Sequence, residues 1–196
     1  MEIIEPILAD FKNLTGPFPQ ATGHYTKKFN ELEGMYENEL EFQNMLPKWS
    51  NRIVYEVWEH RSSNNKGDLV FGTSVMKPGL VGDEFFLTRG HQHQKKYCAE
   101  TYFCLCGKGV ILMENPDGEI KAKKLEKGQL VYVPPLWFHR SINIGDSELV
   151  TLFTYNSDAG QNYEILKKRG GMRKRVVRKD SNIWTLVTNK QYCQSL

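Results

Sequence analysis

From Arg52 onward, short runs rich in Val, Ile, Phe and Tyr alternate with clusters of Gly, Pro, Asn and Asp. Runs of this length and composition, each closed by turn residues, are typical of β-strands. The turn clusters include Lys77-Pro78-Gly79 and Asn115-Pro116-Asp117-Gly118. The pattern predicts strands at Ile53–His60, Leu69–Met76, Glu84–Thr88, Glu100–Leu105, Gly109–Glu114, Ile120–Lys124, Gln129–Val133, Arg140–Asn143 and Leu149–Tyr155.

The spacing of these runs indicates the fold class. The predicted strands recur about every 8–12 residues, as in all-β sandwiches and barrels. The segments between them are too short for the helix of a βαβ crossover. We therefore predict an all-β protein with a few short helices, built as a sandwich or a barrel.

The first fifty residues follow a different pattern. Gly16-Pro17, Phe18-Pro19 and Pro47 interrupt them, which predicts an irregular arm, and the apolar spacing within Asn30–Leu46 supports a short helix. We expect one domain in three parts. These are residues 1–50 as an N-terminal arm packing on the barrel, 51–164 as the barrel, and 165–196 as a basic C-terminal extension of the same domain.

Composition narrows the class of protein. A chain of 196 residues that is 40% hydrophobic can bury a core, so it is not intrinsically disordered. No apolar run approaches the roughly 20 residues that cross a bilayer, and Glu2, Glu5 and Asp10 occupy the region where a secretory signal is basic and then apolar. Four cysteines without a C-x-x-C pair indicate free thiols. We expect a cytoplasmic protein without a membrane partner.

The charge is unevenly distributed. The net charge is +3, yet residues 165–196 carry nine Lys or Arg against the single acid Asp180. The segment Lys167–Lys179 is basic enough to contact phosphates of a nucleic acid. No aromatic stacking pattern or recognition motif interleaves these charges. We therefore expect a solvated surface segment and no nucleic-acid partner.

Three histidines and one acid carry the candidate chemistry. His91 and His93 are two residues apart, so in a strand both imidazoles face the same side. Glu100 begins the next predicted strand, which can return antiparallel beside them, while His139 comes from farther along the chain. Three imidazoles and a carboxylate suit a first-row divalent ion such as Fe, Mn, Ni, Co or Zn. His24 and His60 have no second ligand at useful spacing, and we expect them to be structural or exposed.

These residues resemble the two motifs of the cupin family, roughly G-x5-H-x-H-x(3,4)-E-x6-G and G-x5-P-x-G-x2-H-x3-N. The first is matched by His91, His93, Glu100 and Gly107, and the second by Gly128, Pro134, His139 and Asn143. Six residues separate His93 from Glu100, and the motif glycines are replaced by Phe85 and Leu136. The resemblance implies a cupin jelly-roll barrel.

A more extensive resemblance is to one subfamily, the cupin-type phosphoglucose isomerases first recognised in archaea. It runs from Tyr55 to Tyr163 through VYEVW, GDLVFGTSVMKPG, EFFLTRGHQH, GKG, VYVPPLWFHRSINIGD and YNSDAGQNY. It implies a homodimeric, metal-dependent aldose–ketose isomerase of glycolysis and gluconeogenesis that interconverts glucose 6-phosphate and fructose 6-phosphate. The alternative is a non-catalytic or differently specialised metal-binding cupin that binds a related sugar phosphate.

The same resemblance assigns roles to individual residues. The metal, with Fe or Mn expected ahead of Ni, Co or Zn, would be held by His91, His93, Glu100 and His139. The substrate-binding residues would be Tyr55, Ser74, Thr88, Gly90, Tyr102 and Tyr163, with the phosphate near Ser74, Thr88 and the Gly90 backbone. The catalytic residues would be Glu100, Tyr155 and Gln161.

Several of these assignments have competing interpretations. The tyrosines can also be core or rim aromatics, and Ser74 and Thr88 are common strand residues. Gln161 stands where the subfamily commonly has a histidine suggested for ring opening, and an amide cannot exchange a proton near neutral pH. Glu100 could move the substrate proton, or the hydrogen could pass as a hydride between the same carbons. The residues leave both routes open.

Overall fold

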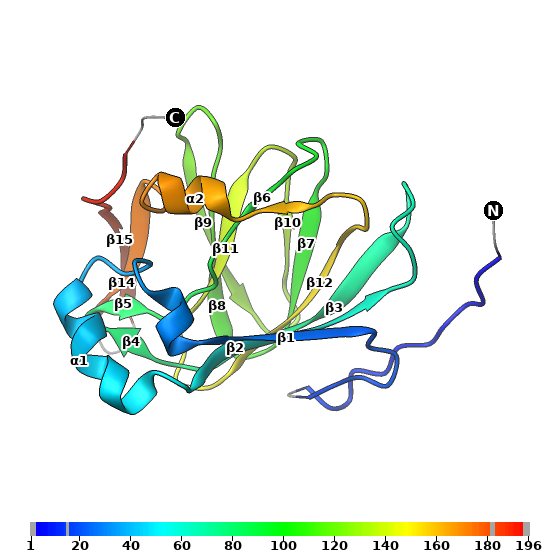
Figure 1. Ribbon diagram of the computed structural model, residues 1–196, viewed down its shortest axis with the longest axis horizontal. Helices are drawn as coiled ribbons and strands as arrows, with labels where there is room; N and C mark the ends of the chain where they lie inside the picture. The colour runs from blue at the N-terminus through cyan, green and yellow to red at the C-terminus, as the bar shows by residue number, and fades with distance from the viewer. Residues whose placement is uncertain (1–2, 15, 181–182, 194–196) are drawn as a thin grey trace.

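The computed structural model describes residues 3–14, 16–180 and 183–193. Strands dominate it, and the helical elements are short, which confirms the predicted all-β class (Figure 1). The helical elements are η1 (Phe29–Leu32, a 3₁₀ turn), α1 (Glu39–Trp49) and α2 (Glu164–Lys168). The strands are β1 (Gly23–Lys28), β2 (Ile53–Arg61), β3 (Leu69–Met76), β4 (Leu80–Val81), β5 (Glu84–Phe85), β6 (Gln92–His93), β7 (Glu100–Cys106), β8 (Lys108–Glu114), β9 (Ile120–Glu126), β10 (Leu130–Val133), β11 (Phe138–Asn143), β12 (Leu149–Asn156), β13 (Gln161–Asn162), β14 (Lys174–Asp180) and β15 (Ile183–Thr188).

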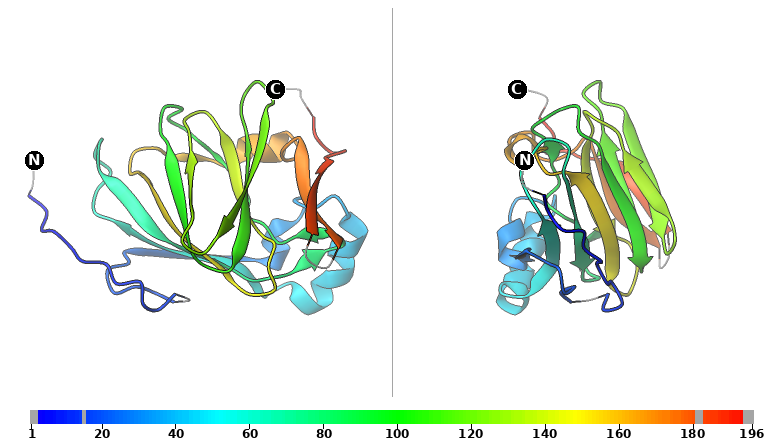
Figure 2. Two further views of the ribbon diagram at one scale, coloured as in Figure 1. Left: turned by 180° about the vertical axis from the view of Figure 1, so that it is seen from behind. Right: turned by 90° about the vertical axis from the view of Figure 1, so that its right-hand side faces the viewer.

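Two antiparallel sheets form the barrel. One has the strand order β1-β2-β3-β12-β7-β10, and the other has the order β11-β8-β9. The sheets curve around a shared interior, as the two orthogonal views show (Figure 2). Buried side chains from both sheets, including Val57, Val110, Leu112 and Phe153, belong to a single apolar cluster. The barrel is therefore one packed core into which polar site residues are set.

Each strand predicted from the sequence overlaps an observed strand, with ends shifted by a few residues. The N-terminal stretch differs from its prediction, because Gly23–Lys28 is no irregular segment but pairs with β2 at the edge of the large sheet. The helix predicted within Asn30–Leu46 is split into η1 and α1 by Gly34, whose φ of 75° is left-handed. Helix α1 then begins where the Asn38 side chain accepts the Glu41 N–H at 3.0 Å.

The basic C-terminal segment is built into the fold. Strands β14 and β15 join β5 and β4 in a further sheet, which lies with α1 at one end of the barrel while the N-terminal segment runs out at the other (Figure 1). Arg175 is buried and pairs with Glu84 at 2.8 Å. Arg169 and Arg173 both pair with the buried Glu114. The expectation of a wholly solvated basic segment is therefore wrong for these three arginines, whose charges are compensated inside the protein.

No helix among the described residues is both long and apolar enough to cross a membrane. The division of the chain at residues 50 and 164 stays a prediction.

Candidate active site

Three strands and one bridge bring the candidate ligands together. His93 belongs to β6, Glu100 begins β7 and His139 lies on β11. His91 is fixed by main-chain hydrogen bonds to His139 in both directions, at 3.0 and 2.9 Å. The turn that precedes β11 includes Leu136, whose φ is 77°. This is the position at which the cupin motif has glycine, so the left-handed backbone is kept although the side chain is a leucine.

The four side chains converge on one carboxylate oxygen. Glu100 Oε2 lies 3.4 Å from His91 Nε2, 3.2 Å from His93 Nε2 and 3.0 Å from His139 Nε2. The four potential ligand atoms all lie within 4.8 Å of one another, and all four residues are buried. The structure thus brings together the complete set of predicted metal ligands.

The protonation states of this cluster match those of metal ligands. Burial opposes ionisation of Glu100, but the close approach of His139, His91 and His93 outweighs it and holds the pKa of that carboxyl well below its usual range. Burial, together with the charge of His139, lowers the pKa of His91 to about 4. A charged carboxylate and a neutral imidazole are the forms that bind a cation.

The hydrogen bonds around the cluster also fit a metal ion. The other ring nitrogen of His139, Nδ1, lies 3.2 Å from the Trp137 carbonyl oxygen, which accepts its proton. With a metal ion bound, this contact favours the tautomer in which Nε2 presents its lone pair to the ion. His91 Nε2 is buried and without a hydrogen-bond partner in the described part of the chain. These donors suit a divalent first-row ion bound by His91, His93, Glu100 and His139.

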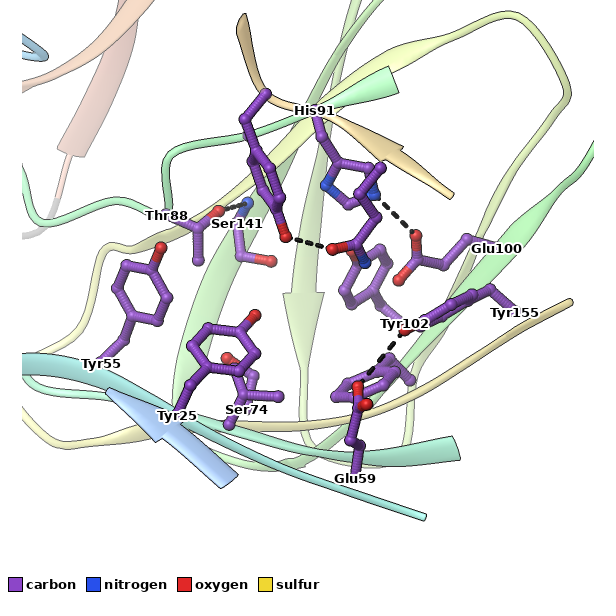
Figure 3. Close-up of a pocket in the computed structure, with 15 residues that line it drawn as sticks. Tyr25, Tyr55, Glu59, Ser74, Thr88, His91, Glu100, Tyr102, Ser141 and Tyr155 are labelled. Carbon is purple, nitrogen blue, oxygen red and sulfur yellow. Dashed lines mark hydrogen bonds and ion pairs between the residues drawn. The ribbon is translucent and has the colours of Figure 1, made fainter. Parts of the chain in front are cut away.

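A pocket of about 510 Å³, its open mouth included, adjoins this cluster. It has two chemically different ends, with hydroxyls at one and the imidazole and carboxylate at the other (Figure 3). His93 and His139 contact Glu100 but do not line the pocket. The lining includes every other residue predicted for the site, namely Tyr55, Ser74, Thr88, Gly90, His91, Glu100, Tyr102, Tyr155, Gln161 and Tyr163.

Five lining residues were missed from the sequence. Val57 and Glu59 lie two and four positions after Tyr55 on β2, so the alternation of a strand places all three on one face. The same rule connects Ser141 with His139 and Phe153 with Tyr155. Tyr25 is different, because it belongs to β1 and reaches the pocket through its pairing with Val57. Alternation could have identified the first four, whereas Tyr25 required the pairing of two strands.

The hydroxyl end is arranged to donate hydrogen bonds. Thr88 Oγ1 accepts the Ser141 N–H at 3.1 Å, and Tyr55 Oη accepts the Arg89 N–H at 3.5 Å. Each hydroxyl oxygen is thus engaged as an acceptor, so its own proton is free to donate to a ligand. Ser74 and Ser141 add two further hydroxyl side chains at this end (Figure 3). Such a cluster of donors without a fixed charge suits an oxyanion.

The tyrosines at the opposite end are neutral donors. Burial, followed by the charge of Glu100, raises the pKa of Tyr102 well above its usual range, and burial raises the pKa of Tyr155. The Tyr155 hydroxyl donates to Glu59 Oε2 at 3.3 Å and accepts from Arg61 Nη2 at 3.2 Å. The Tyr163 hydroxyl donates to Gln161 Oε1. Gln161 therefore has its amide oxygen occupied and its NH₂ group left for a ligand.

Comparison with known proteins agrees with this geometry. The family model described as glucose-6-phosphate isomerase (GPI) matches residues 26–193. Similar relatives include the glucose-6-phosphate isomerase of Sinorhizobium medicae, 43% identical over 97% of this chain and 89% of the relative. The glucose-6-phosphate isomerase of Pyrococcus abyssi is 39% identical over 85% of this chain and 87% of the relative.

Solved structures with a similar arrangement include one of an oxalate oxidase, with a TM-score of 0.47 and 14% identity over 56% of this chain and 54% of that chain. At this TM-score and identity, the oxalate oxidase structure adds no support to the sequence comparison. The match of the family model over most of the chain, and relatives of about 40% identity that it covers almost completely, are sufficient. The chain belongs to the glucose-6-phosphate isomerase family, in the cupin form that its histidine motif indicates.

Proposed function

We propose that this chain is a metal-dependent aldose–ketose isomerase that interconverts glucose 6-phosphate and fructose 6-phosphate. Family membership and the names of its relatives support the reaction. The observation that carries the proposal is the two-ended pocket, in which a donor-rich end faces the same space as His91 and Glu100 of the metal cluster (Figure 3). A hexose phosphate has the matching chemistry, with a phosphate at C6 and the reacting oxygens at C1 and C2.

The substrate phosphate would bind at the hydroxyl end. Donors there are the hydroxyls of Tyr55, Ser74 and Thr88 and the backbone near Gly90. The sugar chain would then extend past Tyr102 and Tyr163 toward Glu100. Neutral donors hold a phosphate without a strong fixed charge, which favours release of a product that carries the same phosphate.

The cluster of His91, His93, Glu100 and His139 would hold the metal, for which Fe or Mn is our proposal. A divalent ion bound there supplies electrostatic stabilisation for negative charge on the reacting oxygens of the sugar. His139 is oriented for this role by its bond to the Trp137 carbonyl. Burial of the four ligands excludes water that would otherwise weaken the interaction.

Glu100 is the group to which we assign the proton transfer. Its carboxyl is ionised, because its pKa is held low, and it lies at the pocket wall. In the forward reaction it would take the proton from C2 of open-chain glucose 6-phosphate and return it to C1, while the hydroxyl proton on O2 passes to O1, which leaves the carbonyl at C2. Tyr155, held by Glu59, and Gln161, held by Tyr163, are placed to position the sugar hydroxyls.

A coupled assay tests this function. Purified protein is given fructose 6-phosphate, and glucose 6-phosphate is followed through its dehydrogenase, before chelation, after chelation and after addition of Mn or Fe. We expect turnover that chelation abolishes and the metal restores. Absence of turnover under every metal condition would leave the alternative, a cupin that binds a sugar phosphate without isomerising it.

We also propose a homodimer. Four large apolar side chains of the N-terminal segment, Ile3, Ile4, Ile7 and Leu8, are exposed, and this segment extends away from the barrel (Figure 1). Packing of this segment against a second copy would remove that surface from water. Sedimentation at micromolar concentration is the test, and a single species with the mass of one chain would contradict the proposal.

A further inference from the structure

A buried arginine donates a hydrogen bond to the main chain of the loop that forms the hydroxyl end of the pocket. Arg140 is only 6% exposed, and its Nη2 donates to the Arg89 carbonyl oxygen at 2.9 Å. It follows His139 on β11 and precedes Ser141, so the alternation of the strand turns it away from the face that those two share. It is therefore outside the pocket, on the opposite side of the loop.

The Arg140 guanidinium has no direct ion pair, although the Glu84 carboxylate acts on it at longer range. No carboxylate among residues 3–14, 16–180 and 183–193 lies within ion-pair distance of it, and its Nε has no hydrogen-bond partner in the same ranges. The neighbouring buried arginine, Arg175, differs in this respect, because it pairs with Glu84 at 2.8 Å. A buried cation without a direct ion pair costs stability. Because burying Arg140 costs stability, its hydrogen bond to the loop calls for a functional explanation.

The bond constrains the direction of one peptide group. The Arg89 carbonyl and the Gly90 N–H belong to the same trans peptide, so they point in opposite directions. Because the Arg89 carbonyl oxygen points toward the Arg140 guanidinium, the Gly90 N–H points away from it. Gly90 lines the pocket, and no group in the described part of the chain accepts its N–H.

The rest of the loop has little freedom to turn this peptide. Thr88 is held by Ser141, whose O accepts its N–H at 2.9 Å, and His91 is held by His139 at 3.0 Å. Gly90 has a φ of 73°, and a Cβ there would meet His139 O at 2.9 Å. Between Thr88 and His91, the Arg140 side chain holds the Arg89–Gly90 peptide by its hydrogen bond to the Arg89 carbonyl oxygen.

We infer that Arg140 is a positioning residue for phosphate binding, which fixes the Arg89–Gly90 peptide so that the Gly90 N–H is a preformed donor for the substrate's phosphate. The inference rests on the proposed function in one respect, namely that a phosphate occupies the hydroxyl end. Preformation matters because a donor that is already oriented needs no reordering when the anion binds.

The first test observes Gly90 itself. Full-length protein labelled with ¹⁵N-glycine and loaded with zinc, which is diamagnetic, is titrated with inorganic phosphate. We expect the Gly90 amide proton to move downfield as phosphate binds. A saturating titration that leaves this resonance in place would overturn the inference. The readout needs no turnover, so failure of the isomerase assay and failure of this inference are distinguishable.

The second test uses variants at Arg140. Loss of one hydrogen bond to a charged group is worth about tenfold or more in affinity. Arg140→Met should therefore raise the dissociation constant for inorganic phosphate, and the KM for fructose 6-phosphate, by about tenfold, with kcat and metal content close to wild type. Arg140→Lys, which retains charge and a donor on a shorter side chain, should fall between Arg140→Met and wild type.

Arg175→Lys is the matched control, because Arg175 is equally buried but does not contact the loop. It should leave phosphate affinity unchanged even if it lowers the melting temperature. Equal weakening of phosphate binding in Arg175→Lys and Arg140→Lys would overturn the inference, since it would show a general effect of destabilisation. Wild-type phosphate affinity in Arg140→Lys and in a folded Arg140→Met would overturn it as well.

Discussion

Gly90 provides a quantitative test of how tightly the phosphate end of the pocket is built. Substitution with alanine adds one methyl group to a residue whose φ is 73°. That methyl carbon would lie 2.9 Å from His139 O, 3.0 Å from Arg140 Cβ and 3.0 Å from Leu166 Cδ1. The first of these contacts is with main chain that also holds His91, so it cannot move without disturbing the metal cluster.

The expected cost has two parts. A left-handed conformation costs an alanine about 1–2 kcal/mol, and overpacking of a filled site costs about 1–3 kcal/mol. Gly90→Ala should therefore lower the free energy of unfolding by about 2–5 kcal/mol. For a chain of this size, that corresponds to a fall in melting temperature of about 4–20 °C.

Gly128→Ala is the matched control. Gly128 has a φ of 85°, yet a Cβ there would meet nothing within 4 Å. Only the conformational part of the cost applies, so this variant should lose about 1–2 kcal/mol. Urea denaturation of both metal-loaded variants measures the difference. If Gly90→Ala is no less stable than Gly128→Ala, the close packing of the loop against β11 and α2 is refuted.

Three further predictions concern the site and the surface. His93→Ala and His139→Ala should each lose most of the bound divalent ion, measured by elemental analysis, because one of four ligands is removed. The control variant His24→Ala changes a residue that stacks on Trp58 and should retain the ion. Undiminished metal in both site variants would exclude the cluster as the metal site. Gln161→His should keep or raise isomerase turnover, because an imidazole can exchange protons near neutral pH, whereas a fall of more than about tenfold would show that the amide itself is needed. The basic segment Lys167–Lys179 should bind no nucleic acid with submicromolar affinity at ~150 mM salt in a filter-binding or anisotropy assay, since three of its arginines are paired internally, and such binding would contradict this.

The strands of the barrel were predictable because their apolar residues alternate and turn residues separate them. Strands β1, β4, β6, β13, β14 and β15 were not among the predicted strands, and for β1 and β14 the physical reason is clear. The first, GHYTKK, is a polar edge strand with no buried alternation of its own, so only its partner β2 defines it. The second contains Arg175, whose burial depends on Glu84, a residue far away in sequence. Pairing of distant residues leaves no local pattern in either segment.

The site was predictable to the extent that its residues share a strand face or a spacing. The metal cluster follows from the H-x-H pair and the order of Glu100 and His139. The direction in which Arg140 holds a carbonyl follows from the path of a loop between two strands. The spacing of apolar and polar residues does not predict that path, because the loop residues have irregular backbone angles such as the positive φ of Gly90.

The most direct measurement compares wild type with Glu100→Gln at saturating metal in the coupled assay. Glutamine keeps the size of the side chain and one acceptor oxygen but cannot take up a proton. Loss of a general base is typically worth about 100- to 10,000-fold in rate. Glu56→Gln is the control, because Glu56 contacts His24 away from the pocket and should leave turnover unchanged. We expect interconversion of the two hexose phosphates by wild type and a loss of that size in Glu100→Gln, with phosphate affinity kept. Wild-type turnover in fully metal-loaded Glu100→Gln would contradict the assignment of the reaction to this cluster.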